Sequence, residues 1–163
     1  MTFRDLQRHT EPQPEFCPRY APAHSCTAKG TVLVVDDEPI ILRGLARLLE
    51  GNSYLVVPCQ TPSQAIERVL CDDVVLVVTD MTMPEMSGLE LLRILHELDA
   101  GLPVVLMSGH SDPDHILEAL ECGVSEYLIK PLDIPRLRQV VERLSRPPSA
   151  VRKDGNLRTS AGS

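Results

Sequence analysis

The sequence predicts an α/β protein with a doubly wound, five-stranded parallel sheet and five helices. The first observation is that five short apolar runs, rich in β-branched residues, alternate with helical stretches along the chain. The second is that the middle runs are continuously apolar, which is typical of strands covered on both faces. The chain has 163 residues, 43% hydrophobic and 3% aromatic, so we expect one domain with an aliphatic core.

The first part of the expected domain contains two strands and two helices. Residues 31–35 (TVLVV) are the first expected strand, and residues 38–51 are the first expected helix. The apolar stripe expected on this helix consists of Ile40, Ile41, Leu45, Leu48 and Leu49. Residues 54–58 (YLVVP) are the second expected strand. The next helix, at residues 61–70, opens with Thr-Pro-Ser-Gln, which predicts a capping box.

Three further strands follow, each leading into a helix. The expected strands are residues 74–79 (VVLVVT), 103–107 (PVVLM) and 126–129 (EYLI). The expected helices are residues 87–98, 112–123 and 133–146. In the first of these helices the leucines at positions 89, 92, 95 and 98 recur at helical spacing, which predicts a buried face.

Both ends of the chain differ in composition from this alternating region, so we expect the domain to span residues 31–146. Residues 1–30 include the stretch EPQPEFCPRYAPAHSC, with four prolines and no periodic apolar pattern, which predicts an extended or disordered extension. Residues 147–163 are polar and predict a flexible tail or linker. The histidines and cysteines of the extension do not have the spacing of a zinc finger.

Charge and cysteine content restrict the class of partner. The net charge is −7, and residues 31–146 hold 19 acidic and 9 basic side chains. Such a domain is a poor direct ligand for nucleic acid and suits cations or basic protein surfaces. With no signal-like or membrane-spanning apolar run and no CxxC pair, we expect a cytoplasmic protein without membrane contact. Cys59, Cys71 and Cys122 are expected to be small buried hydrophobic residues.

Polar residues follow the strands where a functional site is expected, at the carboxyl edge of the sheet. Asp36 and Asp37 follow the first strand, Asp80 the third, Ser108 the fourth and Lys130 the fifth. Taken alone, each residue has a simpler explanation. Asp36 or Asp37 could cap the following helix, and Asp80 could be a turn residue. Ser108 could be a loop hydroxyl and Lys130 a solvated charge. Their combination at one edge favours a functional site.

The chemistry of these groups indicates phosphoryl transfer. Three carboxylates about 4 Å apart repel by about 4 kcal/mol per pair at an effective dielectric constant near 20, which a bound hard cation such as Mg²⁺ relieves. One carboxylate could then attack phosphorus, while the ammonium and hydroxyl groups hold phosphoryl oxygens. Neither GxGxxG after the first strand nor GxxxxGK[ST] anywhere is present, which excludes the usual nucleotide-binding motifs.

Four stretches in order, VLVVDDEP, VVTDMTMPEMSGLELL, VVLMSGH and EYLIKPL, resemble the receiver domain of two-component response regulators. The resemblance covers about residues 31 to 146. It implies a flavodoxin-like sheet with strand order 2-1-3-4-5 and a phosphoprotein that forms an aspartyl phosphate. It also implies a signalling domain that catalyses only its own phosphorylation and dephosphorylation, rather than a metabolic enzyme.

The resemblance also assigns roles to individual residues. Asp80 would be the phospho-acceptor, and Mg²⁺ would be held by Asp36, Asp37, Asp80 and the backbone carbonyl of Thr82. The other implied roles are as follows: Lys130, on a cis Lys-Pro peptide, binds the phosphoryl group; Ser108 and Tyr127 act as the switch pair; the side chains of Thr82 and His110 tune phosphate lifetime.

The implied phosphoryl donor is a sensor histidine kinase or phosphotransfer protein. The implied target is a downstream protein or a further output domain, and a second copy of the chain could bind in a phosphorylation-dependent homodimer. Phosphorylation would remodel the face formed by the fourth helix, fifth strand and fifth helix. Two alternatives stay open: a pseudo-receiver that binds partners without phosphorylation, and a haloacid-dehalogenase-like phosphatase. The second is disfavoured because Thr82 stands where that family has another Asp.

Overall fold

The structure, a computed structural model, describes residues 30–50, 54–109 and 112–145. The predicted tail at 147–163 and nearly all of the predicted extension at 1–30 lie outside these residues. Five strands form one parallel sheet in the order β2-β1-β3-β4-β5, which confirms the predicted fold and strand order. The strands are β1 (Thr31–Val35), β2 (Leu55–Cys59), β3 (Val74–Asp80), β4 (Val104–Ser108) and β5 (Glu126–Ile129).

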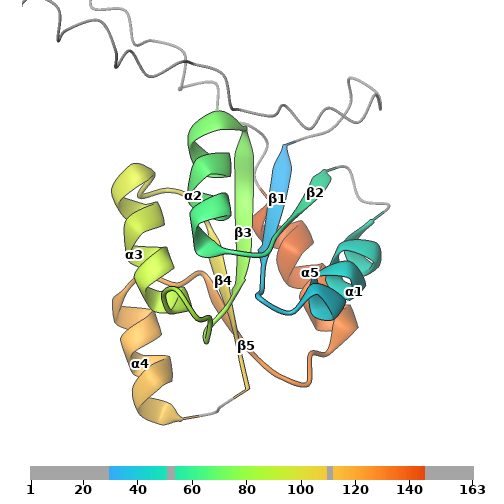
Figure 1. Cartoon of the computed structure of the whole chain (residues 1–163). Helices are drawn as coiled ribbons and strands as arrows, with labels where there is room; N and C mark the ends of the chain where they lie inside the picture. Colours follow the sequence, from blue (N-terminus) through green and yellow to red (C-terminus); the bar gives the residue numbers. More distant parts are fainter. Residues whose placement is uncertain (1–29, 51–53, 110–111, 146–163) are drawn as a thin grey trace, which may run out of the picture.

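Five helices alternate with the strands and cover both faces of the sheet (Figure 1). They are α1 (Pro39–Leu49), α2 (Pro62–Cys71), α3 (Gly88–Leu98), α4 (Pro113–Glu121) and α5 (Ile134–Leu144). Helices α1 and α5 pack on one face, and α2, α3 and α4 on the other. No helix in the described parts of the chain is both long enough and apolar enough to cross a membrane.

The core consists of two aliphatic clusters, one on each face of the sheet. Alternate residues of β1 supply both, because successive strand side chains point to opposite faces: Leu33 and Val35 join one cluster, and Val32 and Val34 join the other. Helix α3 buries four leucines against the sheet, each contributing about 1.5–3 kcal/mol relative to exposure. Leu98, predicted to continue this face, is instead 44% exposed at the end of the helix.

Several details differ from the sequence prediction. Strand β2 begins and ends one residue later than predicted, as does β4, and β3 extends by one residue to include Asp80. The predicted stripe of α1 is partly wrong: Leu42, Leu45 and Leu49 are buried, whereas Ile40 is 76% exposed. Among the cysteines, Cys59 is buried as predicted, Cys122 is half-buried, and Cys71 is exposed, because it ends α2 on the solvent side.

The start of α2 differs slightly from the predicted capping box. The Thr61 hydroxyl accepts a hydrogen bond from the amide of Gln64, as predicted. However, the Gln64 side chain accepts from the amide of Gln60 rather than from that of Thr61. A complete capping box lies instead at the start of α3, between Ser87 and Glu90.

Strand β2 lies at one edge of the sheet and carries a proline, Pro58, opposite Val34 of β1. The amide of Leu55 donates to the carbonyl of Gly30, the residue just before β1, so the nitrogen of Leu55 faces β1. Because backbone groups alternate along a strand, the nitrogens of Val56 and Pro58 face the outer edge. Pro58 has no N–H, but its nitrogen faces away from β1, so no hydrogen bond between the two strands is lost.

Candidate functional site

The strand register brings polar residues at the ends of four strands, β1, β3, β4 and β5, to one edge of the sheet. Val35 of β1 lies opposite Thr79 of β3, so the chain reaches Asp36 beside Asp80. Ser108 of β4 lies opposite Ile129 of β5, so Lys130 follows at the same level. The predicted convergence of Asp36, Asp80, Ser108 and Lys130 at the carboxyl edge is thus what the sheet topology produces.

Lys130 joins the two aspartates directly. Its Nζ atom lies 2.5 Å from Oδ1 of Asp80 and 3.3 Å from Oδ2 of Asp36. The side chain of Lys130 is 25% exposed, whereas that of Asp36 is 1% exposed. The buried Asp36 carboxylate needs this partner, because removing the ammonium group would leave its charge uncompensated. Lys130 is therefore part of a charge network rather than the solvated cation that its position alone would allow.

The charge of Lys130 is maintained by its neighbours. Burial lowers the pKa of Lys130, but the hydrogen bond to Asp80 and the charges of Asp36 and Asp80 outweigh burial and raise that pKa above its usual value. The ammonium group is consequently protonated at neutral pH. It offers a fixed positive charge to any anionic group that approaches Asp80.

Asp36 is held from both sides. Its Oδ1 accepts a hydrogen bond of 2.9 Å from the amide of Glu38, while its Oδ2 contacts Lys130. Its own amide donates to the carbonyl of Cys59 on β2. The N-cap of α1 is Glu38, and that residue makes no side-chain capping bond, so neither Asp36 nor Asp37 is the N-cap residue of α1. Asp37 is half-buried and lies directly after Asp36.

Asp80 is fixed by the loop that follows it. Its Oδ2 accepts a hydrogen bond of 2.8 Å from the amide of Thr82. The amide of Met81 donates to the carbonyl of Met107, which joins this loop to β4, and the amide of Gly88 donates back to the carbonyl of Met81. Asp80 itself is only 7% exposed. The carboxylate is therefore positioned before any ligand arrives.

Gly88 allows α3 to begin close to Asp80. A Cβ atom built on Gly88 would lie 2.4 Å from the carbonyl oxygen of Asp80 and 2.9 Å from Cδ2 of Leu106. The contact to a backbone oxygen cannot be relieved by turning a side chain. The absence of a side chain at position 88 is therefore what brings the start of the helix against the end of β3.

The remaining predicted residues are distributed around this centre. Ser108 is buried at the end of β4, and its carbonyl accepts a hydrogen bond of 2.8 Å from the amide of Lys130. Tyr127 is half-buried on β5 and packs against the core cluster on the α2, α3 and α4 face. Thr82 is exposed. His110 lies outside the described residues. The Lys130–Pro131 peptide bond is cis, as predicted.

The donor set of this edge suits a hard cation in its chemistry. Asp36 and Asp80 supply carboxylate oxygens, which are the protein ligands that Mg²⁺ prefers, and Asp37 is adjacent in the chain. Across the described residues, however, no three His, Cys, Asp or Glu side chains are grouped closely enough to hold a metal ion. In this arrangement the Lys130 ammonium is the group between the two carboxylates.

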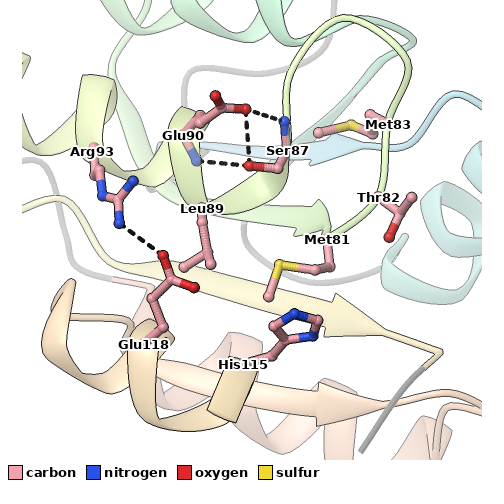
Figure 2. A pocket seen from close by; sticks show the side chains of 9 residues that line it. All are labelled: Met81, Thr82, Met83, Ser87, Leu89, Glu90, Arg93, His115 and Glu118. Carbon is pink, nitrogen blue, oxygen red and sulfur yellow. Dashed lines mark hydrogen bonds and ion pairs between the residues drawn. The ribbon is translucent and has the colours of Figure 1, made fainter. Parts of the chain in front are cut away.

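The loop after Asp80 forms one wall of a groove that the sequence analysis did not identify (Figure 2). At its rim, Ser87 and Glu90 form the capping box of α3, in which each side chain binds the other residue's amide. These bonds lower the pKa of Glu90. One turn further along α3, Nη2 of Arg93 lies 3.0 Å from Oε1 of Glu118, which belongs to the facing helix α4. The Ser-x-x-Glu spacing could have revealed the box, whereas no sequence signal predicts the ion pair.

Comparison with known proteins identifies one family. The family model of the response regulator receiver domain matches residues 32–142. The chain is 37% identical over 112 residues to the transcriptional regulatory protein ZraR of Escherichia coli, covering 69% of this chain and 25% of ZraR. It is 32% identical over 133 residues to the two-component response regulator ARR10 of Arabidopsis thaliana, covering 80% of this chain and 24% of ARR10.

The solved structures give the same result. A response regulator receiver domain protein from Clostridium thermocellum superposes with a TM-score of 0.66 at 30% identity, covering 70% of this chain and 92% of that one. By contrast, the chain spans only about a quarter of the length of the curated relatives ARR10 and ZraR.

Proposed function

The chain belongs to the response regulator receiver domain family, and from this premise we propose that Asp80 accepts a phosphoryl group from a sensor histidine kinase or phosphotransfer protein. The observation that carries the proposal is the contact of Lys130 with both Asp80 and Asp36. A receiver is a signalling domain rather than a metabolic enzyme. The proposed chemistry is therefore limited to transfer of the phosphoryl group to Asp80 and its later hydrolysis.

In the proposed reaction a carboxylate oxygen of Asp80 attacks phosphorus. A new O–P bond forms as the P–N bond to the donor histidine breaks, and the imidazole keeps the electron pair of that bond. The Thr82 amide orients the Asp80 carboxylate through Oδ2, and the Lys130 ammonium stabilises the negative charge on the phosphoryl oxygens. Hydrolysis of the acyl phosphate returns Asp80 to its starting state.

Receiver domains in general bind Mg²⁺ at the phosphorylation site. For this chain we propose Asp36, Asp37, Asp80 and the Thr82 carbonyl as its ligands. Bound there, the cation would neutralise charge on the phosphoryl group and on the three carboxylates. The near-complete burial of Asp36 supports this assignment, since a buried carboxylate is stabilised by a close positive charge.

The response to phosphorylation is proposed to be a population shift that begins at Ser108, which lies beside Lys130 at the carboxyl edge of the sheet. Ser108 and Tyr127 would act as the switch pair and change the face formed by α4, β5 and α5. Two features support this: the Ser108 carbonyl binds the Lys130 amide, and α4 fully buries only Ala119, so little packing must be lost when it moves. The remodelled face would bind a downstream protein, a further domain of a longer regulator or a second copy of the chain.

Phosphorylation with a small-molecule donor tests the central proposal. Incubation with acetyl phosphate and Mg²⁺ should add one phosphoryl group, seen by intact mass as an acid-stable, base-labile modification. Asp80→Asn should abolish the modification. Asp73→Asn, a matched change of an exposed residue before the amino end of β3, should leave it intact.

Two outcomes would contradict the proposal. An unmodified native protein would favour the alternative of a pseudo-receiver that binds partners without phosphate. Equal modification of the native protein and of Asp80→Asn would place the phosphoryl group elsewhere.

A further inference from the structure

A groove of about 440 Å³ lies between the loop after Asp80, α3 and α4 (Figure 2). Its floor is apolar, because Met81, Met83 and Leu89 line it and are each almost fully buried. Its rim consists of the more exposed side chains Glu90, Arg93, His115 and Glu118. The groove thus combines an apolar floor, including two adaptable thioether side chains, with a charged and solvent-accessible rim.

The surroundings of this groove are acidic. Helix α4 and its N-cap carry Asp112, Asp114, Glu118 and Glu121, and α4 contains no Lys or Arg. Arg93 is the one Lys or Arg of α3 and α4, and Glu118 already neutralises it at 3.0 Å. The carboxylates of this rim and helix therefore favour an occupant with positive charge, and the floor favours one with aliphatic side chains.

The described chain ends close to the same pair of helices. A second cavity, of about 280 Å³, is lined by Arg143 and Leu144 at the end of α5, by His96 of α3 and by Gly123 just after α4. A Cβ atom on Gly123 would lie 3.4 Å from Cε1 of His96, so the chain just after α4 lies close to α3. Glu118 lies five residues before Gly123, about 8 Å back along α4 at 1.5 Å per residue.

We propose that the groove binds the chain's own C-terminal segment, residues 146–163 (RPPSAVRKDGNLRTSAGS), which lies outside the described residues. This segment carries four basic residues and one acidic residue. Twice it places an aliphatic residue directly before a basic one, as Val151-Arg152 and Leu157-Arg158. The aliphatic side chains match the floor of the groove, and the basic ones match the carboxylates of Glu90, Glu118 and α4.

The length of the segment is sufficient. Arg152 follows the last described residue, Ser145, by seven positions, which span up to about 23 Å in an extended chain. This exceeds the distance along α4 from Gly123 to Glu118. The N-terminal segment is a weaker candidate, because residues 1–29 carry four basic and three acidic side chains, an excess of one positive charge against three for residues 146–163. The proposal goes beyond phosphorylation and does not depend on it.

Amide chemical shifts of the full-length, unphosphorylated chain test the proposal. The double variant Arg152→Glu/Lys153→Glu should shift the amide resonances of Leu89, His115 and Glu118, because the reversed charges are repelled from the rim. Raising NaCl from about 0.1 to about 1 M should move the same resonances of the native chain, since the Debye length falls from about 10 to about 3 Å.

The matched control reverses two charges at the other end of the chain, Arg4→Glu/Arg8→Glu, and should leave the groove resonances in place. The proposal is overturned if the Arg152/Lys153 variant leaves these resonances unchanged, or if the control shifts them equally. Shifts that depend on protein concentration would also overturn it, because they would show a segment of a second copy in the groove.

Discussion

The Nζ atom of Lys130, at the end of β5, lies 2.5 Å from Oδ1 of Asp80, at the end of β3. The two residues belong to strands separated by β4, so the contact crosses the carboxyl edge of the sheet. The same Nζ atom lies 3.3 Å from Oδ2 of Asp36, which follows β1. The ends of three strands are thus joined through one ammonium group.

Replacing Lys130 by Met should lower the free energy of unfolding in metal-free buffer by about 3 kcal/mol, because two buried carboxylates lose their counter-charge. Urea denaturation with a chelator present measures this. Added Mg²⁺ should restore part of the loss if it binds the same carboxylates. Arg43→Met, a change at an exposed position of α1, is the control and should cost far less. Equal losses in the two variants would mean that Lys130 does not stabilise the aspartates.

Asp37→Asn should raise the Tm of the metal-free protein by about 4 °C, which corresponds to about 1 kcal/mol for a domain of this size. The expected cause is relief of repulsion among the carboxylates of Asp36, Asp37 and Asp80. The same change should reduce the increase in Tm that Mg²⁺ produces in the native protein by mass action. Thermal melts with and without MgCl₂ measure both effects. A lower metal-free Tm, or an undiminished Mg²⁺ effect, would count against Asp37 as a ligand.

Two glycines within helices should respond in opposite directions to the same substitution. Gly88→Ala should destabilise the protein by about 2 kcal/mol, because its Cβ would meet the Asp80 carbonyl oxygen at 2.4 Å. Gly44→Ala should stabilise it by about 1 kcal/mol, since nothing lies within 4 Å of that Cβ and alanine favours the helix. Urea denaturation of both variants checks this. A stable Gly88→Ala protein would show that α3 can move away from Asp80 without cost.

Glu126 should contribute stability that depends on pH. Its Oε1 lies 3.0 Å from Arg136 and its Oε2 lies 2.6 Å from Arg143. Burial raises the pKa of Glu126, but the two arginines outweigh burial and hold that pKa below its usual value of 4.5. Between the folded and unfolded pKa values the unfolded chain binds more protons, so this stability is present above pH 4.5 and is lost as the pH falls through the folded pKa.

Glu126→Gln should accordingly be less stable than the native protein at pH 7 by about 1 kcal/mol, as expected for largely exposed ion pairs. The difference should shrink below pH 4.5 and disappear below the folded pKa. Urea denaturation over a pH series measures it, with Glu67→Gln on the exposed side of α2 as the control. A difference that stays constant with pH would show that the glutamate charge is not involved.

Short, continuously apolar strands that alternate with helices were sufficient to predict a parallel sheet covered on both faces, whereas the strand order was implied only by the resemblance to receiver domains. Once the strands are parallel, the positions of Asp36, Asp80 and Lys130 follow from the topology. The same reasoning could not determine the rotation of α1. Its apolar residues at positions 40, 41, 42, 45, 48 and 49 cover a wide arc, and only packing against the sheet selects Leu42, Leu45 and Leu49.

Contacts between surface residues that are far apart in the chain could not be predicted from the sequence either. The pairs Arg93–Glu118 and Glu126–Arg143 depend on how α3, α4, β5 and α5 are placed in space, and charged surface residues show no periodic pattern that reveals their partners. The exposure of Cys71 has a similar cause, because the last residue of a helix can face either the sheet or solvent.

Pro58 has a consequence for self-association. An edge strand normally offers a row of N–H and C=O groups to which a strand of another molecule can add, and this is a common first step in aggregation. The nitrogen of Pro58 faces that outer edge and has no hydrogen to donate, so an incoming strand would lose one ladder bond near the carboxyl end of β2. The proline thus costs the native sheet no hydrogen bond while making its open edge a poorer template for intermolecular β-pairing.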